Sequence, residues 1–272
     1  MPDPSPDSSD ARNPVSRCVR VGLLLLAAAC GNAALAQADN HADGPRSLLI
    51  TYRADPAKRP AFRQFLAHEE LARLAAWKLQ GVVANYQILF NPVVTEDTWD
   101  AMLVLRFRHF ADTAGWMAIE RNAPGGLSAA GLALGKPVNS YSADADWEGG
   151  EDTANADTGG IFYVIPYEYR AEGEYRKYMD GYVLPQVKGW MSTGVLTGYR
   201  IFMNRYPVGK PWDCLFILRY RDLDAFGKRE ATIARVRDGL QSDPQWKAWA
   251  DNKGGIRTES ENIIAEAVRA ER

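Results

Sequence analysis

The sequence has few cysteines and histidines, and it carries no large excess of charge of either sign. Of its 272 residues, 3 are cysteine and 3 are histidine, and the formal net charge is −2. A near-neutral chain has no basic field to attract nucleic acid, so we expect no nucleic-acid partner. Because no cysteine–histidine cluster and no H-x-x-x-H spacing occurs, the sequence predicts no metal site.

A long apolar run occurs only near the N-terminus. Three arginines precede the run 21–29, and Ala36-Gln37-Ala38 follows it. This order is typical of a secretory signal peptide that is cleaved before Asp39. The run is short and interrupted, which disfavours a membrane-spanning helix. We therefore expect an exported protein, periplasmic or secreted, with no membrane span after processing.

Cys30 offers an alternative to soluble release. It directly follows the apolar run, as does the acylated cysteine of a bacterial lipoprotein, so a lipid anchor at Cys30 stays open. Cys18 lies within the predicted signal peptide. Cys214 is then the one cysteine of the mature chain, which excludes an intramolecular disulfide there. Its apolar strand favours a small core residue over a nucleophile.

The chain contains one segment twice. A shift of 113 residues aligns 62–108 with 175–221 without a gap, and thirteen of the 47 aligned positions are identical. A match of this length within one chain indicates duplication of a structural unit. The identical pairs include Trp77/Trp190, Gly81/Gly194, Tyr86/Tyr199, Trp99/Trp212, Asp100/Asp213 and Arg106/Arg219.

Both copies predict the same order of elements. Each begins with a β-rich run and continues with apolar residues at helical spacing. Pro185 should bend or interrupt the second of these helices, whereas Gly81 and Gly194 suit helix C-termini. The expected strands are 47–53, 82–91, 99–108 and 137–145, then 161–169, 195–204, 212–221 and 255–266; the helices are 57–79, 110–121, 172–192 and 223–241.

The segment 125–137, GGLSAAGLALGKP, approaches a phosphate-loop pattern. Its spacing between glycines is one residue too short, and Pro137 replaces the hydroxyl residue. It also precedes a strand, whereas a phosphate loop leads into a helix. We interpret it as a flexible loop.

The order β-α-β-β-α-β is that of a ferredoxin-like unit, an α+β arrangement with helices on one face of its sheet. Two such units can cover each other's open face. The arrangement resembles the dimeric α/β-barrel superfamily, in which two ferredoxin-like units pack sheet to sheet around a central cavity. Here the resemblance implies a barrel completed within one chain. That superfamily includes cofactor-free monooxygenases, haem-degrading enzymes, polyketide cyclases and muconolactone isomerases, so the fold alone selects no reaction.

These observations divide the chain into six parts. We expect a signal peptide at 1–38, a flexible tail at 39–46, one ferredoxin-like unit at 47–146, an acidic Gly-rich linker at 147–160, a second unit at 161–267 and a C-terminal tail at 268–272.

Strand alternation separates two faces on the third strand of each unit. Trp99 and Leu103 fall on an apolar face that should meet the helices, whereas Asp100 and Arg106 fall on a mixed face that should line the interior. The second copy repeats this pattern. Two interpretations of the interior arginines stay open: they pair with carboxylates of the chain, or they bind the carboxylate or enolate of a ligand.

Repeated tyrosines could add hydroxyl groups to such a pocket, although each could equally be aromatic core. The predicted ligand-binding set is Arg106, Arg219, Tyr86, Tyr199, Tyr163, Asp100 and Asp213. The sequence identifies no catalytic residue.

Two functions from different classes remain. One is an exported small-molecule-binding protein or cofactor-independent enzyme, with an aromatic or carboxylate-bearing ligand between the sheets. The other is a non-catalytic binding or structural protein of the cell envelope, which a lipid anchor would tether. We expect no cofactor; haem is an alternative by resemblance alone, because His68 is expected on a solvated helix face and His109 at a helix N-cap.

Overall fold

The computed structural model describes residues 43–150, 160–206 and 212–270, and its compact unit is Pro45–Arg272. The predicted signal peptide and Cys30 lie outside these residues. The first half consists of β1 (Ser47–Ala54), η1 (Pro56–Lys58), α2 (Arg59–Phe65), η2 (Leu66–Glu70), α3 (Leu71–Leu79), β2 (Asn85–Phe90), β3 (Ala101–Arg106), η3 (Phe110–Asp112), α4 (Thr113–Glu120), η4 (Pro124–Gly126), α5 (Ala129–Leu134) and β4 (Gly135–Gly150).

The second half repeats this order with a larger helical part. It consists of β5 (Ile161–Tyr169), α6 (Glu172–Tyr178), η5 (Met179–Val183), α7 (Leu184–Ser192), β6 (Leu196–Asn204), β7 (Cys214–Tyr220), α8 (Leu223–Gly227), α9 (Arg229–Leu240), α10 (Pro244–Ile256), β8 (Arg257–Glu259) and β9 (Ile263–Ala267). No helix among the described residues is long and apolar enough to cross a membrane.

The long helix of each half contains a π-helical turn at the same place in the repeat, η2 in the first half and η5 in the second. The expected bend or interruption at Pro185 has a counterpart, because the π-helical turn η5 ends at Val183 and α7 begins at Leu184 with Pro185 in its first turn. Ala72 occupies the equivalent position in the first half, so proline is not the cause of the wider turn. Gly81 and Gly194 do end their helices with φ of 77° and 72°, the left-handed conformation that glycine favours.

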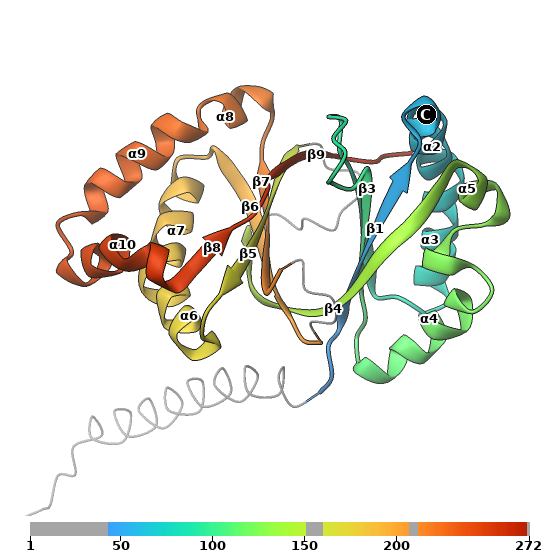
Figure 1. Ribbon diagram of the computed structural model, residues 1–272, viewed down its shortest axis with the longest axis horizontal. Helices are drawn as coiled ribbons and strands as arrows, with labels where there is room; N and C mark the ends of the chain where they lie inside the picture. The colour runs from blue at the N-terminus through green and yellow to red at the C-terminus, as the bar shows by residue number, and fades with distance from the viewer. Residues whose placement is uncertain (1–42, 151–159, 207–211, 271–272) are drawn as a thin grey trace, which may run out of the picture. The chain divides into compact units, whose positions relative to one another are not determined.

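The strands form one closed ring within the chain (Figure 1). Strand β4 pairs with β1 of its own half and with β6 of the other, and β9 likewise pairs with both β2 and β5. The pairing of β5 with β7 completes the circuit. The predicted α+β dimeric-barrel class is thus confirmed, with one refinement: the two sheets are joined at both edges, which removes the free edges of each.

Alternating residues along the strands divide the core into three clusters. Leu103 and Leu105 pack under the helices of the first half, whereas Met102 and Val104 belong to the barrel interior. This alternation is as predicted for β3 and β7. Trp99 and Trp212 are exceptions, because both pack with the interior cluster. They precede their strands, where the backbone no longer alternates with a period of two.

Two segments expected to be irregular are ordered. Residues 129–134 form helix α5, whose first turn is capped by the Ser128 hydroxyl accepting from the Gly131 N–H. The flexible-loop interpretation of 125–137 is therefore wrong. Strand β4 runs to Gly150, into the segment expected as a linker, because it continues to pair with β6. The remainder of that linker, 151–159, lies outside the described residues.

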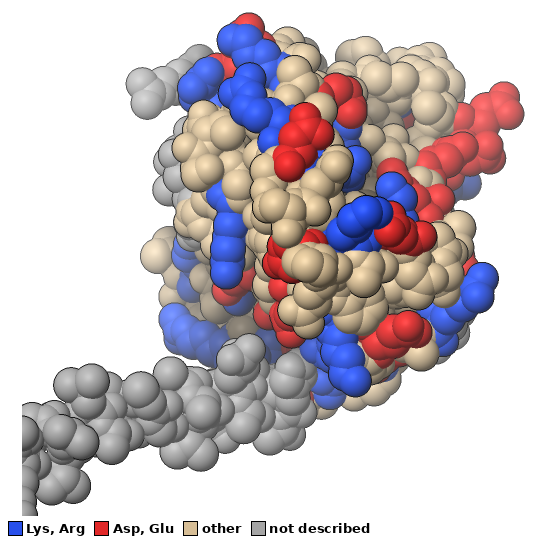
Figure 2. Space-filling model, turned by 90° about the vertical axis from the view of Figure 1, so that its left-hand side faces the viewer, with Lys and Arg blue, Asp and Glu red and all other residues tan. Residues whose placement is uncertain are grey.

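The helices α6, α7, α9 and α10 cover the barrel on the side of the second half (Figure 1). On this face basic and acidic side chains are interspersed (Figure 2). Several form ion pairs one helical turn apart, such as Lys228 with Asp224 at 2.5 Å and Lys247 with Asp251 at 2.7 Å. Exposed charges of both signs keep a helical surface well hydrated, and ion pairs between them contribute little to the stability of the fold.

Candidate functional site

A cavity opens at the end of the barrel where the β2–β3 and β6–β7 connections lie. Its volume is about 350 Å³, and it reaches the interior side chains Met102, Val164 and Leu215. This size falls within the range of about 300–1,000 Å³ that is typical of small-molecule sites. Apolar surface dominates its lining, and polar groups such as Thr51 and Ser260 are fewer.

Three aromatic side chains line this cavity. Trp99 and Trp212 occupy equivalent positions of the repeat, each two residues before the third strand of its half, and Tyr141 extends from β4. The rings of Tyr141 and Trp212 lie with their centroids 5.3 Å apart at an angle of 63°. Burial raises the pKa of Tyr141 to about 12, so its phenol remains neutral at physiological pH.

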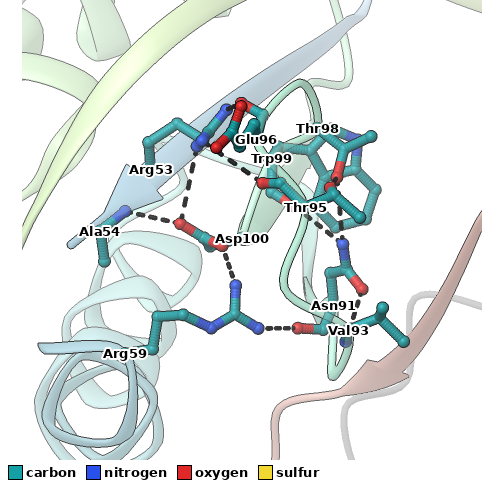
Figure 3. A network of polar contacts seen from close by, with 10 residues as sticks. All are labelled: Arg53, Ala54, Arg59, Asn91, Val93, Thr95, Glu96, Thr98, Trp99 and Asp100. Carbon is teal, nitrogen blue, oxygen red and sulfur yellow. Dashed lines mark hydrogen bonds and ion pairs between the residues drawn. The ribbon is translucent and has the colours of Figure 1, made fainter. Parts of the chain in front are cut away.

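A network of polar contacts holds the connection that carries Trp99 (Figure 3). Asp100, which is 3% exposed, accepts hydrogen bonds from the Ala54 N–H at 2.7 Å and from the guanidinium of Arg59. The Asn91 amide donates to the Trp99 carbonyl at 3.2 Å. The Arg59–Asp100 pair replaces the hydration that both charges lose on burial, and it fixes the backbone on either side of Trp99.

Arg53 is the basic residue in the cavity lining, and its guanidinium is turned toward the β2–β3 connection (Figure 3). Its terminal nitrogens donate to the carbonyls of Glu96 at 2.5 Å and Thr95 at 3.4 Å. Its Nε lies 3.8 Å from the Asp100 carboxylate. Arg53 therefore links the β2–β3 connection to β1 through hydrogen bonds.

A second, more open hollow of about 610 Å³ lies beside the ends of β5 and β9. Four of its charged side chains form two pairs: Arg221 with Asp222 at 2.9 Å and Arg63 with Glu266 at 3.9 Å. Although it is larger, it is a charged surface groove with little apolar depth. The barrel cavity is the better candidate because its lining is mostly apolar and reaches buried side chains of the interior.

The seven residues predicted from the sequence lie elsewhere. Tyr86 packs under the helices of the first half, and Tyr163 and Tyr199 pack under those of the second. Asp100 and Asp213 stand just before β3 and β7, where each accepts a backbone N–H, from Ala54 and from Tyr169 respectively.

Arg106 and Arg219 lie at the far ends of β3 and β7 from the cavity. Arg106 donates to both carboxylate oxygens of Glu148, at 2.9 and 3.3 Å, and the Nε of Arg200 also donates to Glu148. The structure thus brings Arg106 together with Glu148 and Arg200, and Arg219 is buried in the same barrel end. Of the two interpretations left open, pairing with a carboxylate of the chain describes Arg106.

The aromatic lining of the cavity could have been found from one signal in the sequence. Trp99 and Trp212 are identical across the repeat, and a conspicuously large residue retained in both copies just before a strand suggests a shared role. Tyr141 has no such signal, because the fourth strands of the two halves do not align in sequence.

Other reactive groups lie apart from the cavity. Cys214 is fully buried under the helices of the second half, and burial raises the pKa of its thiol, which makes it a poor nucleophile. His68 and His109 are both exposed, and neither lines the cavity. Among the described residues no group of three potential metal ligands occurs. The cavity lining therefore offers no histidine or cysteine to hold a haem iron.

Comparison with known proteins supports the fold. No family model matches the chain, and no curated protein matches it. Similar solved structures include an anthrone oxidase-like protein, which is 9% identical with a TM-score of 0.50 over 84% of this chain and 92% of that chain.

Two further solved structures are similar at lower TM-scores. A mutant chlorite dismutase from Candidatus Nitrospira defluvii is 11% identical, with a TM-score of 0.48 over 83% of this chain and 91% of that chain. A heme-binding protein from Thermus thermophilus is 12% identical, with a TM-score of 0.46 and the same two coverages. At such low identity the similarity concerns architecture alone. The strand order and the match to the anthrone oxidase-like protein together establish that this chain has the dimeric α/β-barrel fold.

Proposed function

We propose that this protein binds a small, largely apolar organic molecule in the cavity at the end of the barrel. The observation that carries the proposal is the lining itself: Trp99, Tyr141 and Trp212 are among the residues that line a cavity of about 350 Å³ in the ring of strands. Large aromatic side chains offer an apolar body and a polar edge, a combination suited to holding organic molecules.

Binding is favoured over catalysis because the carboxyl group whose pKa is shifted to near neutrality lies outside the cavity. Displaced pKa values often mark catalytic sites. Here burial raises the pKa of Glu70 to about 7, but Glu70 lies in the helical layer of the first half. The cavity lining has hydroxyl and carboxylate groups and no histidine or cysteine beside them. The similarity to an anthrone oxidase-like protein keeps an enzyme as the second candidate.

We also propose that the chain is exported. The support is the order of arginines, apolar run and small residues in the first 38 residues, which lie outside the described part of the chain. Mass spectrometry of protein purified from the envelope and medium of the producing cell tests it. A mature N-terminus at Asp39 supports soluble release, an acylated Cys30 supports the lipid-anchored alternative, and an intact Met1 contradicts both.

Blocking the mouth of the cavity tests the binding function. Val138 lines the cavity and is 47% exposed, so Val138→Trp should fill the entrance without disturbing the core. Leu79→Trp is the matched control, because Leu79 is 89% exposed at the end of α3. Thermal unfolding would be followed with indole, 2-naphthol and phenyltrimethylammonium as probes.

A probe that binds the native state raises the melting temperature. We expect at least one probe to do so for the unaltered chain and for Leu79→Trp, and to lose the effect in Val138→Trp. Absence of a rise with every probe, or an equal rise in the Val138→Trp variant, would contradict binding in this cavity.

A further inference from the structure

The charged residues that line the cavity do not favour an anion. Among the described residues they are Arg53, Asp97 and Glu261, so acidic groups outnumber basic ones in this part of the lining. Asp97 and Glu261 are exposed, which places both carboxylates at the mouth. Lys136 pairs with Arg53 across β1 and β4, but it is exposed and does not line the cavity.

The basic group of the lining is already engaged. The guanidinium of Arg53 donates to the Glu96 and Thr95 carbonyls, and it also faces the Asp100 carboxylate at 3.8 Å (Figure 3). An incoming carboxylate or phosphate would have to displace these contacts. It would also have to pass Asp97 and Glu261. The cavity therefore disfavours an anionic ligand. Such a ligand was one of the two interpretations of the interior arginines that the sequence left open.

The aromatic residues of the lining favour a cation. The electron-rich faces of indole and phenol rings attract cations, most strongly when the cation is large and weakly hydrated. Trp99, Tyr141 and Trp212 provide two indoles and one neutral phenol, and the inclined pair Tyr141–Trp212 presents two differently oriented rings. Several aromatic rings around one space, with carboxylates at its edge, form an aromatic cage for an alkylated ammonium group.

We propose that the ligand of this cavity is an organic cation, a quaternary or alkylated ammonium group on an apolar body; this inference rests on the binding function proposed above. The aromatic rings hold the cation, and Asp97 and Glu261 attract it to the mouth. The apolar body reaches Met102, Val164 and Leu215 in the interior. No covalent step is required.

Three probes of different charge test this inference, and the first two have the same shape. Phenyltrimethylammonium and tert-butylbenzene differ in the nitrogen or carbon at their centre, and benzoate supplies an anionic comparison. Titration of the full chain would be followed by tryptophan fluorescence and calorimetry at physiological salt. We expect the cation to bind about tenfold more tightly than its uncharged isostere, the scale of cation–π attraction in a partly desolvated site. Benzoate should bind more weakly than either.

Matched variants distinguish binding by the aromatic rings and the two mouth carboxylates from a general effect of the protein's charge. Asp97→Asn and Glu261→Gln should each weaken the cation severalfold and leave tert-butylbenzene unchanged, with a smaller difference at high salt. Asp238→Asn, which makes the same charge change at an exposed site on α9, should leave both unchanged. Trp99→Leu should weaken the cation more than the neutral probe.

The outcomes distinguish the two proposals. Equal affinity for phenyltrimethylammonium and tert-butylbenzene, abolished in Val138→Trp, overturns the cation inference and leaves the binding function intact. Tighter binding of benzoate also overturns it. If none of these probes nor indole and 2-naphthol binds, both proposals fail.

Discussion

The two halves of this chain keep the same barrel but cover it differently. Both have a π-helical turn at one position of the repeat and a tryptophan that enters the barrel before the third strand. Beneath the helices, the first half has Phe62 and Phe65 where the second has Tyr175 and Tyr178. The shared tryptophans face the cavity, and the divergent residues lie in the helical layers.

The helical layer of the second half contains a continuous stack of aromatic rings. Tyr175, Tyr178, Tyr182 and Trp246 follow one another with centroids 4.9–5.9 Å apart. Helix α10 supplies Trp246 and lies over this stack. In the first half the position of Val183 is instead taken by Glu70, a buried carboxyl whose Oε1 has no hydrogen-bond partner among the described residues. The two halves therefore share the tryptophan before the third strand, whereas their outer packing differs.

The largest expected effect concerns the aspartate before the third strand. Asp100→Asn would leave the buried guanidinium of Arg59 without its carboxylate, which costs about 3–5 kcal/mol. In the second half Asp238→Asn removes an exposed carboxylate from α9 and should cost less than about 1 kcal/mol. Urea unfolding of the two variants measures the difference, and equal losses would show that the buried Arg59–Asp100 pair does not stabilise the first half.

The next effect concerns the buried carboxyl of the first half. Burial raises the pKa of Glu70 from 4.5 to about 7, so the native state retains a proton that the unfolded chain releases. Stability should therefore fall as pH rises from 4.5 through 7, by about 3 kcal/mol from this group.

Replacing Glu70 isolates that contribution. Glu70→Gln should remove the decline between these pH values, whereas Glu174→Gln, at an exposed helical position of the second half, should retain it. Unfolding free energies measured at several pH values provide the comparison. An unchanged decline in the Glu70→Gln variant would assign it to another group.

The smallest effect is expected at the barrel end opposite the cavity. Arg106 and Glu148 are partly exposed, at 32% and 43% of their side chains, so Arg106→Met should cost less than about 1 kcal/mol. Binding of phenyltrimethylammonium should not change, because Arg106 does not line the cavity. A large loss of affinity in this variant would support the ligand-binding role that the sequence suggested for Arg106.

Much of the fold was predictable because the repeated segment shows the same pattern of helices and strands twice. The element order and the dimeric-barrel class followed from two copies of one pattern, and alternation along β3 correctly separated Leu103 from Val104. The inward face of β2 was not predictable. It begins Asn85-Tyr86-Gln87, so both of its faces carry polar atoms, and alternation could not show that Gln87 is the buried interior residue.

The cavity lining was missed for a different physical reason. Trp99 was assigned to the helical side by extending the alternation of β3 backward. The backbone changes course at Asp100, whose N–H donates to the Tyr52 carbonyl while its carbonyl accepts from Asn91. This irregular connection turns the indole toward the interior. Residues at strand ends depend on such tertiary contacts, which periodicity does not encode.

A crystal structure of the full chain grown with phenyltrimethylammonium tests the central claim most directly. We predict that the probe lies in the barrel cavity, with its ammonium group among Trp99, Tyr141 and Trp212 and its phenyl ring directed toward Met102. The claim would be contradicted if these side chains filled the space themselves, or if the probe occupied only the groove beside Arg63 and Arg221.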